Sequence, residues 1–362
     1  MPLTPFSAFF ASSNIMIIRH LLLIAAITLS CGSAVAQTVF VKDCGQKAFP
    51  DNVPAGNYSG ITLVGGNEYA VVSDKSATDG FYVFNIDIDS ISGEITDVSL
   101  KAFLCDSLRG GDCEAIAYRP SSGTLFICSE TDGAIREYGK DGKLTGRQLD
   151  VPPVFSNHAG NYGFESLTYD DCLFWTINES TLKCDGQQAT PQNGAENMLR
   201  LQSFGDDLKP RSQYAYRMDA PEASKNASVY AMGVSELAAT GDGRLLVLER
   251  EFYVPKTKIG AFVCCKIYEI TPEEDFTIPA GEALTDSTKA LPKRLVHSFK
   301  TKLGLFNRSL ANYEGMCLGP TLADGSKVII LVSDSQNQYA GVLKDWFKTI
   351  IIKSTDTEVG AK

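Results

Sequence analysis

Acidic residues recur at two positions of a repeated two-strand pattern in this chain. Carboxylates that are brought together by such a repeat can bind a metal ion. The positions that open each repeat are Ser59, Glu114, Glu165, Glu236 and Glu314, and the acids that close it are Asp74, Glu130, Glu179, Glu249 and Asp334. Carboxylates held close together repel one another and raise each other's pKa unless a cation lies among them. A flexible set of hard oxygen ligands suits Ca²⁺ better than zinc or copper.

The stretch from residue 312 to residue 337 shows the repeat most clearly. Glu314 opens a first apolar strand, the turn Ala-Asp-Gly-Ser follows, and the apolar run Val328–Val332 ends at Asp334. The Asp-Gly pair favours a tight hairpin, and a short β-branched run is typical of a buried strand. In a hairpin the start of one strand lies beside the end of the other, so we expect Glu314 and Asp334 to share one edge of a sheet.

A third strand pattern follows each of the five hairpins, and a fourth follows the first four. Four-stranded antiparallel units repeated along a chain predict an all-β fold, a single β-propeller of five blades. A sixth, degenerate blade would fit within residues 205–232 or 271–312. The run Thr38–Val41 could supply the missing strand of the last blade, so the N-terminal strand is expected to close the ring. The opening glutamates would then converge at one mouth of the central channel.

The N-terminal residues 1–36 have the pattern of a cleaved secretory signal peptide. A basic residue precedes the apolar run Leu21–Leu29, and Ala34-Val35-Ala36 supplies a small-residue cleavage site. The run is too short for a typical membrane span. We therefore expect a signal peptide over residues 1–36, a propeller domain over residues 37–362, and a secreted or periplasmic protein. Lipid anchoring at Cys31 stays open.

The net charge of the chain disfavours some classes of binding partner. The chain has 362 residues, of which 44% are hydrophobic, enough for a sizeable core, and its formal net charge is −10. An acidic surface disfavours nucleic acid and anionic membranes, whose phosphates would repel it. No stretch after the N-terminal segment is long and apolar enough to span a bilayer, and we expect a monomer that acts on a small ester or phosphate ester.

Nine cysteines remain after the predicted cleavage. Some cysteines of an exported protein are expected to be paired, and disulfides between Cys172 and Cys184 or between Cys105 and Cys113 would close local loops. The pairing itself cannot be read from spacing, and an odd number leaves at least one thiol over. The spacings match no zinc site.

Three motifs resemble the phytase-like propeller family, described by its "esterase-like activity of phytase". They are the run Gly241–Arg250, the Asn-Tyr-Glu-Gly run with Leu-Gly-Pro from Asn312, and the Leu-Val-Ser-Asp ending at Asp334. The resemblance extends from about Tyr58 to Lys353. It implies a secreted or periplasmic propeller, related in fold to calcium-dependent phytases and phosphotriesterases. Arg250 stands where the family pattern carries an arginine, whereas Ser59 and Cys113 depart from the pattern.

A metal-assisted hydrolase assigns roles to these positions. The expected calcium ligands are Glu165, Glu236 and Glu314, with Asp334 and Asp74. Glu114 or Glu249 would be a further ligand or the base, and Arg250 and Lys75 would hold substrate oxygens, with His158 reaching the mouth from its loop. Strand alternation counts against substrate binding by Arg250 and Lys75, because on a regular strand Arg250 points away from Glu249 and Lys75 points away from Asp74.

Two other interpretations stay open. Any one of the glutamates could instead accept backbone N–H bonds that hold neighbouring blades in register, and a propeller with such residues could bind a ligand or a protein without catalysis. The chain has no Gly-x-Ser-x-Gly motif, so a serine esterase of the α/β-hydrolase class is unsupported.

Overall fold

A computed structural model describes residues 35–110, 112–158 and 163–357 of the chain. These residues fall into two compact units, a large one over residues 38–354 and a small one that joins residues 35–37 to residues 355–357. In the small unit the hydroxyl of Thr355 donates to the carbonyl of Gln37 over 3.5 Å. Apart from its last two residues, the predicted signal peptide lies outside the described residues, as does Cys31.

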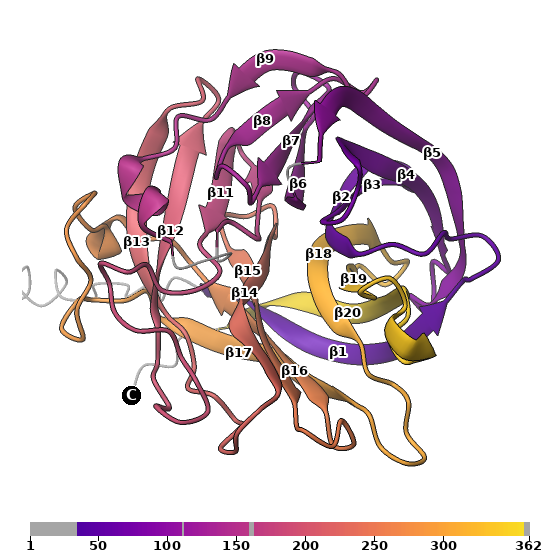
Figure 1. Cartoon of the computed structure of the whole chain (residues 1–362). Coiled ribbons are helices and arrows are strands. Elements are labelled where there is room, and N and C mark those ends of the chain that lie inside the picture. Colours follow the sequence, from indigo (N-terminus) through magenta and orange to yellow (C-terminus); the bar gives the residue numbers. More distant parts are fainter. Residues whose placement is uncertain (1–34, 111, 159–162, 358–362) are drawn as a thin grey trace, which may run out of the picture. The chain divides into compact units, whose positions relative to one another are not determined.

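The strands form five antiparallel sheets of four strands each (Figure 1). The first sheet consists of β2 (Tyr58–Gly65), β3 (Glu68–Ser73), β4 (Thr78–Ile88) and β5 (Ile95–Arg109). The second consists of β6 (Cys113–Arg119), β7 (Thr124–Ser129), β8 (Ile135–Tyr138) and β9 (Leu144–Gln148). The third consists of β10 (Thr168–Asp170), β11 (Leu173–Ile177), β12 (Met198–Gly205) and β13 (Pro210–Arg217).

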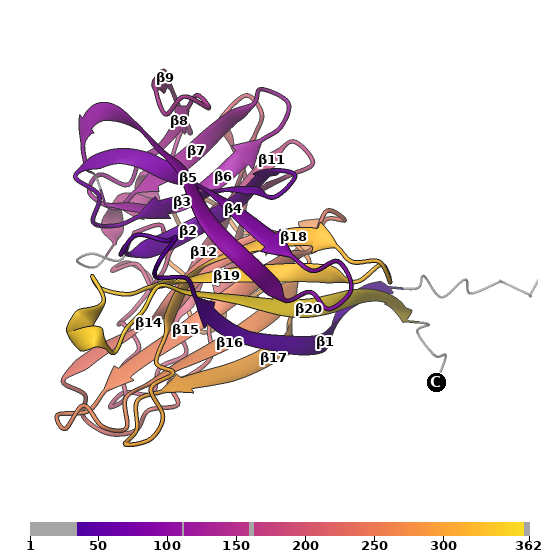
Figure 2. The same cartoon turned by 90° about the vertical axis from the view of Figure 1, so that its right-hand side faces the viewer.

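The fourth sheet consists of β14 (Val229–Ala239), β15 (Leu245–Val254), β16 (Phe262–Ile270) and β17 (Lys293–Lys302). The fifth runs in the order β18 (Asn312–Thr321), β19 (Lys327–Asp334), β20 (Trp346–Thr357) and β1 (Val35–Ala48). In Figure 2 the indigo strand β1 runs beside the yellow strand β20. The N-terminal strand is therefore the fourth strand of the last sheet, as predicted.

The five predicted repeats are confirmed, and every named strand of the described chain belongs to one of them. No sixth sheet occurs there, because β13 and β17 belong to the third and fourth sheets and the rest of residues 205–232 and 271–312 is mostly loop. The described helical segments are three short 3₁₀ turns: η1 (Pro153–Asn157), η2 (Glu274–Phe276) and η3 (Tyr339–Gly341). Within the described residues, no helix has the length and hydropathy that crossing a membrane requires.

The first strands of the five sheets surround one centre (Figure 1). Strand β2 contacts β6 and β18, β10 contacts β6 and β14, and β14 contacts β18. A separate apolar cluster fills each space between consecutive sheets, including the space between the fifth sheet and the first. Phe126 of the second sheet packs on Phe174 of the third, for example, with ring centroids 4.3 Å apart. Both faces of most inner strands are therefore buried.

This double burial explains the continuous apolar run of β19. Val328, Val332 and the three residues between them are all fully buried. The turn before the run is closed by a hydrogen bond of 2.7 Å from the Leu322 N–H to the Ser326 carbonyl. Gly325 has a φ of +82° there, a left-handed conformation that glycine adopts without strain. Glu314 and Asp334 consequently lie at the same edge, since Asn312 pairs with Asp334.

The third sheet differs from the prediction at its first strand. Glu165 opens the third predicted repeat, so residues 164–167 should form a strand, but they contribute only the bridge between Phe164 and Asn178, and β10 begins at Thr168. The Ser166 side chain takes over part of the ladder: its hydroxyl donates to the Ile177 carbonyl and accepts from the Ile177 N–H, both over 3.1 Å. A serine that bonds the backbone in this way competes with regular strand pairing.

The expected disulfides are not formed. All nine cysteines of the described chain are free, including the Cys172, Cys184, Cys105 and Cys113 for which pairing was predicted. Five of the nine are buried. Burial raises the pKa of the Cys113 thiol to about 12 and that of the Cys264 thiol to about 12. These thiols behave as small apolar side chains, which explains them without cross-links.

Candidate functional site

Each sheet presents one unpaired residue near the start of its first strand. In the fifth sheet Tyr313 pairs with Ser333 and Gly315 with Val332, so Glu314 is left without a partner. The same irregularity falls at Ser59 in the first sheet and at Ser235 in the fourth. Matching the pairs gives the first-strand positions of the site as Ser59, Glu114, Glu165, Ser235 and Glu314.

The second strand of each sheet adds one more residue at the same edge. Asp334 pairs with Asn312, and Arg250 pairs with Gly233. The amides of Asp74, Glu130 and Glu179 donate, over 2.9–3.2 Å, to the carbonyls that lie two residues before Ser59, Glu114 and Glu165. The second-strand positions are therefore Asp74, Glu130, Glu179, Arg250 and Asp334. Four of these five are acids, and the fourth sheet places a guanidinium among them.

Glu236 and Glu249 lie one residue away from these positions. Glu236 follows the unpaired Ser235, and Glu249, which pairs with Val234, precedes Arg250. A shift of one residue along a strand turns a side chain to the other face. The repeat was aligned on its glutamates, and in the fourth sheet that alignment is wrong by one residue on both strands.

Arg250 lies at the centre of the site. Its Nη1 atom donates to Oδ1 of Asn312 over 2.9 Å and to Oε1 of Glu314 over 2.8 Å. Its Nη2 atom lies 3.1 Å from Oε1 of Glu179 and 3.4 Å from Oε2 of Glu165. Burial alone would lower the pKa of Arg250, but Glu314, Glu165 and Glu179 raise it, so the guanidinium stays charged.

Seven carboxylates lie near one another at these positions, three of them paired with Arg250, and we call the seven the acidic cluster. They are Glu114, Glu165 and Glu314 at the first-strand positions, and Asp74, Glu130, Glu179 and Asp334 at the second-strand positions. Among the described residues, two basic side chains pair with them: Arg250, and Lys75, whose Nζ lies 2.6 Å from Oδ2 of Asp74. The cluster therefore carries an excess of negative charge when its members are ionised.

That excess is visible in the pKa of each member. Burial, followed by repulsion from Glu165 and Glu314, raises the pKa of Glu114 well above its usual value. Burial and the neighbouring acids likewise raise the pKa of Glu130 to about 7. Burial raises the pKa of Asp334 to about 6, although an N–H bond from Gln336 opposes the shift. At neutral pH the cluster holds protons that free carboxylates would have lost.

Glu130 and Lys75 lie at the open rim of the cluster. The Lys75 side chain is 58% exposed. Asp112, which has a left-handed φ of 50°, lies near both of them and repels Glu130. The alternation that would turn Lys75 away from Asp74 does not apply, because β3 ends at Ser73.

The sequence-based prediction gives three residues of the site no role in it. It includes Glu130 and Glu179 only as closing acids of their repeats, and Asn312 only as part of a family motif. Asn312 donates from Nδ2 to Oε1 of Glu314 over 2.8 Å and to Oδ2 of Asp334 over 3.4 Å, so it links both acids of its hairpin to Arg250. The pairing of the hairpin ends was the signal that could have found it.

Glu236 binds backbone groups. Its Oε1 atom accepts N–H bonds of 3.0 Å from Leu167 of the third-sheet segment and from Leu237 of its own strand. The side chain is fully buried, and this burial raises its pKa well above the usual value even though the N–H bonds oppose the shift. Glu236 thus has the arrangement that was considered as the structural alternative, an acid that joins neighbouring sheets.

Glu249 belongs to a second, balanced network on the other face of β15. Its Oε1 atom accepts bonds of 2.6 Å from the Tyr216 hydroxyl and from Lys293 Nζ. Lys293 also lies 2.7 Å from Asp219, and Lys266 lies 2.7 Å from the same aspartate. Two lysines thus face two acids, and the network holds the loop at residue 219 against the fourth sheet.

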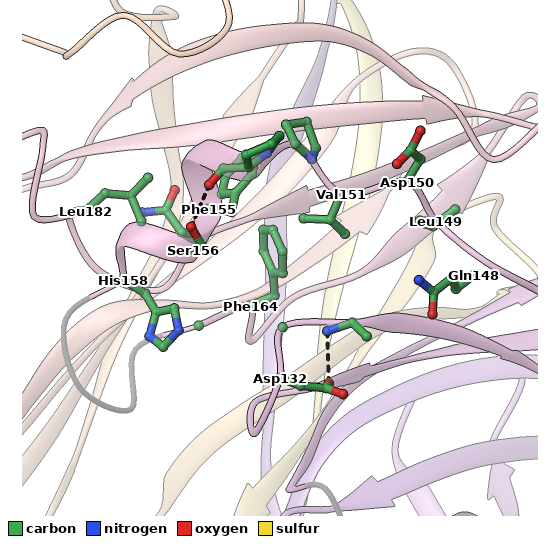
Figure 3. Close-up of a pocket in the computed structure, with 16 residues that line it drawn as sticks. Asp132, Gln148, Leu149, Asp150, Val151, Phe155, Ser156, His158, Phe164 and Leu182 are labelled. Carbon is green, nitrogen blue, oxygen red and sulfur yellow. Dashed lines mark hydrogen bonds between the residues drawn. The ribbon is translucent and has the colours of Figure 1, made fainter.

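His158 lies on the wall of a separate pocket (Figure 3). The pocket has a volume of about 350 Å³, and Figure 3 shows His158, Phe155, Phe164 and Asp132 around it. No carboxylate of the acidic cluster lines it. The two are neighbours all the same, because Gly163 of the pocket wall packs against Glu130: a β-carbon on Gly163 would lie 3.6 Å from Cγ of Glu130.

The acidic cluster has the charge and donor type for a hard cation but not the spacing of a formed metal site. Within the described residues, two buried carboxylate oxygens of the cluster, Oδ1 of Asp74 and Oε2 of Glu179, have no hydrogen-bond partner, and neither has Oε2 of the adjacent Glu236. Among residues 35–110, 112–158 and 163–357, no three or more His, Cys, Asp or Glu side chains are grouped so that they could hold a metal ion. A bound cation would have to draw the carboxylates together.

Comparison with known proteins gives a family. Three solved structures show low similarity to this chain. A DUF4221 family member from Bacteroides vulgatus has 7% identity and a TM-score of 0.38, and the match covers 90% of this chain and 100% of that one. A protein of unknown function from Bacteroides thetaiotaomicron has 11% identity and a TM-score of 0.35 (88% of this chain and 76% of that one), and the Cps50 (Swd1) β-propeller domain of Myceliophteria thermophila has 8% identity and a TM-score of 0.33 (84% and 98%). At these TM-scores the likeness carries no argument. No curated protein matches the chain significantly. The phytase-like family model, described as "Esterase-like activity of phytase", matches residues 53–336, so the chain belongs to the phytase-like family and has a β-propeller fold.

Proposed function

We propose that this chain hydrolyses phosphate esters or related esters with calcium bound at the acidic cluster. The observation that carries the proposal is the charge of the site: seven carboxylates lie close together there, and in the described part of the chain Arg250 and Lys75 are the basic side chains paired with them. Such a site gains free energy from a divalent cation. We also propose that the protein is exported and monomeric, and that β1 closes the ring of five blades.

The calcium ligands would come from the cluster members at the mouth. Glu114, Glu165 and Glu314 supply the first-strand carboxylates, and Asp74 and Asp334 supply those of the second strands. Calcium bound there would neutralise the charge of a phosphate group and polarise the ester bond. Glu236 and Glu249 are left out of this set because each is already bonded within the protein.

The remaining groups have roles set by their exposure. Glu130 is half-buried at the rim next to Asp74, and it would take a proton from the attacking water. Lys75 is exposed beside it and would bind a substrate oxygen as a point charge. Arg250 is buried and would position Glu165, Glu179 and Glu314 rather than touch the substrate.

Calcium binding is tested by thermal unfolding of the chelator-treated protein with and without calcium. A cation at about one hundred times its Kd would stabilise the fold by about 2.7 kcal/mol. Glu114→Gln and Glu314→Gln should each raise the melting temperature of the calcium-free protein, because repulsion is relieved, and should abolish most of the calcium shift. Glu94→Gln is the control, since Glu94 is exposed and bonds Lys42 and Lys47 outside the cluster.

Hydrolysis is tested with p-nitrophenyl phosphate, bis(p-nitrophenyl) phosphate and p-nitrophenyl acetate. We expect calcium-dependent turnover that falls by about 10²-fold or more in Glu130→Gln, while the calcium shift of that variant is kept. A calcium shift without turnover on any of these substrates would overturn the hydrolase. Absence of a shift with any divalent ion would overturn the metal site as well.

One observation favours a second function, a propeller that binds a ligand without catalysis. Both terminal nitrogens of Arg250 already donate to protein acceptors, so the family arginine is not free to hold a substrate. Calcium would then organise a binding face, and the protein would retain an unreacted phosphate ester in equilibrium dialysis without converting it.

A further inference from the structure

Two loops at one end of the fourth sheet are hydrogen-bonded to each other. They are the β15–β16 loop, residues 255–261, and the start of the connection from β17 to β18, residues 303–308. The Gly260 N–H donates to the Leu303 carbonyl over 2.8 Å, and the Leu303 N–H donates to the Ala261 carbonyl over 2.9 Å. We call these two segments the paired loops.

The paired loops expose large apolar side chains. Phe306 is 102% exposed, Leu305 is 71% exposed, and Ile259 is 53% exposed. Single exposed apolar residues are normal on a protein surface. Three of them on loops that are hydrogen-bonded to each other, with a phenylalanine that contacts almost nothing, mark an interaction site.

The charge around these side chains is opposite to that of the chain. The formal net charge of the protein is −10, but residues 252–268 and 287–313 contain no Asp or Glu. Four exposed basic residues belong to this surface and form no ion pair with any described carboxylate: Lys256, Lys258, Lys302 and Arg308. Lys258 donates instead to the hydroxyl of Tyr339 over 2.8 Å. The apolar tips therefore lie in segments of the chain whose basic residues are not paired with a described carboxylate.

We propose that the paired loops dock this protein on an anionic lipid surface. Phe306, Leu305 and Ile259 insert at the level of the headgroups, and the four basic residues face the lipid phosphates. The acidic remainder of the protein is repelled by the same surface, so the protein can approach it only with this face. The sequence-based expectation that anionic membranes are disfavoured rests on the net charge, and this proposal departs from it for one patch.

A lipid surface explains the patch better than a protein partner does. The apolar residues project from loop tips, which suits a deformable headgroup layer, whereas a protein partner would need a matching pocket. Stable protein interfaces bury roughly 800 Å² on each side, and three side chains on two loops fall well short of that area. Insertion of a few apolar side chains beside several basic ones is enough for reversible membrane binding. The proposal does not depend on the proposed hydrolase.

The test is sedimentation of the full chain with vesicles. We expect binding to vesicles of mixed phosphatidylglycerol and phosphatidylcholine, no binding to phosphatidylcholine alone, and a loss of binding at high salt. Phe306→Ser should weaken binding about tenfold, and Lys258→Glu should weaken it at least as much. Ile91→Ser is the matched control, because Ile91 is 81% exposed but lies between Asp89 and Glu94.

The three substituted residues, Phe306, Lys258 and Ile91, are exposed, so each variant should keep the melting temperature of the parent protein. Failure to bind vesicles that contain phosphatidylglycerol would overturn the proposal. So would equal loss of binding in Ile91→Ser and Phe306→Ser. Capture of a soluble acidic protein by the paired loops, with no vesicle binding, would assign the surface to a protein partner instead.

Discussion

The Nη1 atom of Arg250 lies 2.8 Å from Oε1 of Glu314 and thereby joins β15 of the fourth sheet to β18 of the fifth, across 64 positions of the sequence. The same guanidinium reaches Glu165 and Glu179 beside the third sheet. One buried side chain of the fourth sheet therefore holds carboxylates of the third and fifth sheets that would otherwise repel each other.

Removal of this guanidinium should destabilise the protein strongly. Arg250→Met leaves three buried carboxylates without their counter-charge, and we expect a loss of about 3–5 kcal/mol in the free energy of unfolding, measured with urea without calcium. The free energy of unfolding of Arg250→Lys should lie between the values of the parent protein and of Arg250→Met, because a single ammonium cannot span all the acceptors. The control is Arg211→Met, whose exposed pair with Asp207 is worth about 0–1 kcal/mol. Equal losses in the two methionine variants would contradict this account.

Glu236 should respond to substitution as a structural residue. Glu236→Gln keeps an oxygen that can accept from the Leu167 and Leu237 amides, so stability and the calcium shift should both be retained. Glu236→Ala leaves these buried N–H groups unpaired and should cost about 2–4 kcal/mol. Thermal unfolding of both variants with and without calcium measures this. Loss of the calcium shift in Glu236→Gln would return Glu236 to the ligand set.

The calcium-free protein should lose stability as pH rises from about 4.5 to 7. The pKa of Glu130 rises from 4.5 to about 7 on folding, and that of Asp334 from 3.8 to about 6. A carboxyl whose pKa is raised in the folded state contributes stability below its unfolded pKa, and this contribution is lost as pH passes the folded value.

We expect the acidic cluster as a whole to lower the free energy of unfolding by about 2 kcal/mol between about pH 4.5 and 7. Urea unfolding at a series of pH values measures this loss. Below about pH 4 the slope should reverse, because Asp242, whose bond to Arg244 lowers its pKa to about 2, loses its contribution on protonation. Saturating calcium should flatten the upper range. Stability that rises steadily from pH 4.5 to 7 without calcium would contradict the raised pKa values.

The free cysteines predict a simple labelling pattern. Cys172 and Cys184 are exposed, so these two thiols should react with a maleimide in the folded protein, and the five buried ones only after unfolding. The reaction should be slower than for a free thiol, because nearby Asp206 raises the pKa of Cys172. A reducing agent should leave the melting temperature unchanged. Cys172→Ser removes one site of labelling, and a fall in melting temperature on reduction would reveal a disulfide.

The five hairpins and the sharing of one edge by Glu314 and Asp334 followed from sequence because both depend on local periodicity and turn chemistry. The register of the fourth sheet did not, because an unpaired residue is set by packing against neighbouring sheets. The packing leaves a sequence trace: a small residue follows the unpaired one in Glu114-Ala115, Glu165-Ser166 and Glu314-Gly315. A β-carbon on Gly315 would lie 3.1 Å from Cα of Gly60, so bulk is excluded there.

The fourth sheet lacks that trace. The large Glu236 follows the unpaired Ser235 where the other sheets have a small residue, so no signal in the sequence indicates that Arg250 takes the place of a closing acid there. The free thiols and the unpaired phenylalanine at residue 306 had no comparable trace, since burial and exposure of single side chains depend on contacts far along the chain.

Strand β20 lies between β19 and β1 in the fifth sheet, and this order has a consequence for biogenesis. Strand β1 can pair with β20 only after the other eighteen strands have been made. Until then the outer edges of β1 and β19 stay available to strands from other copies of the chain. The window for misassembly therefore lasts from the synthesis of β1 to that of β20, and a chain interrupted before Trp346 would leave two edges open at once.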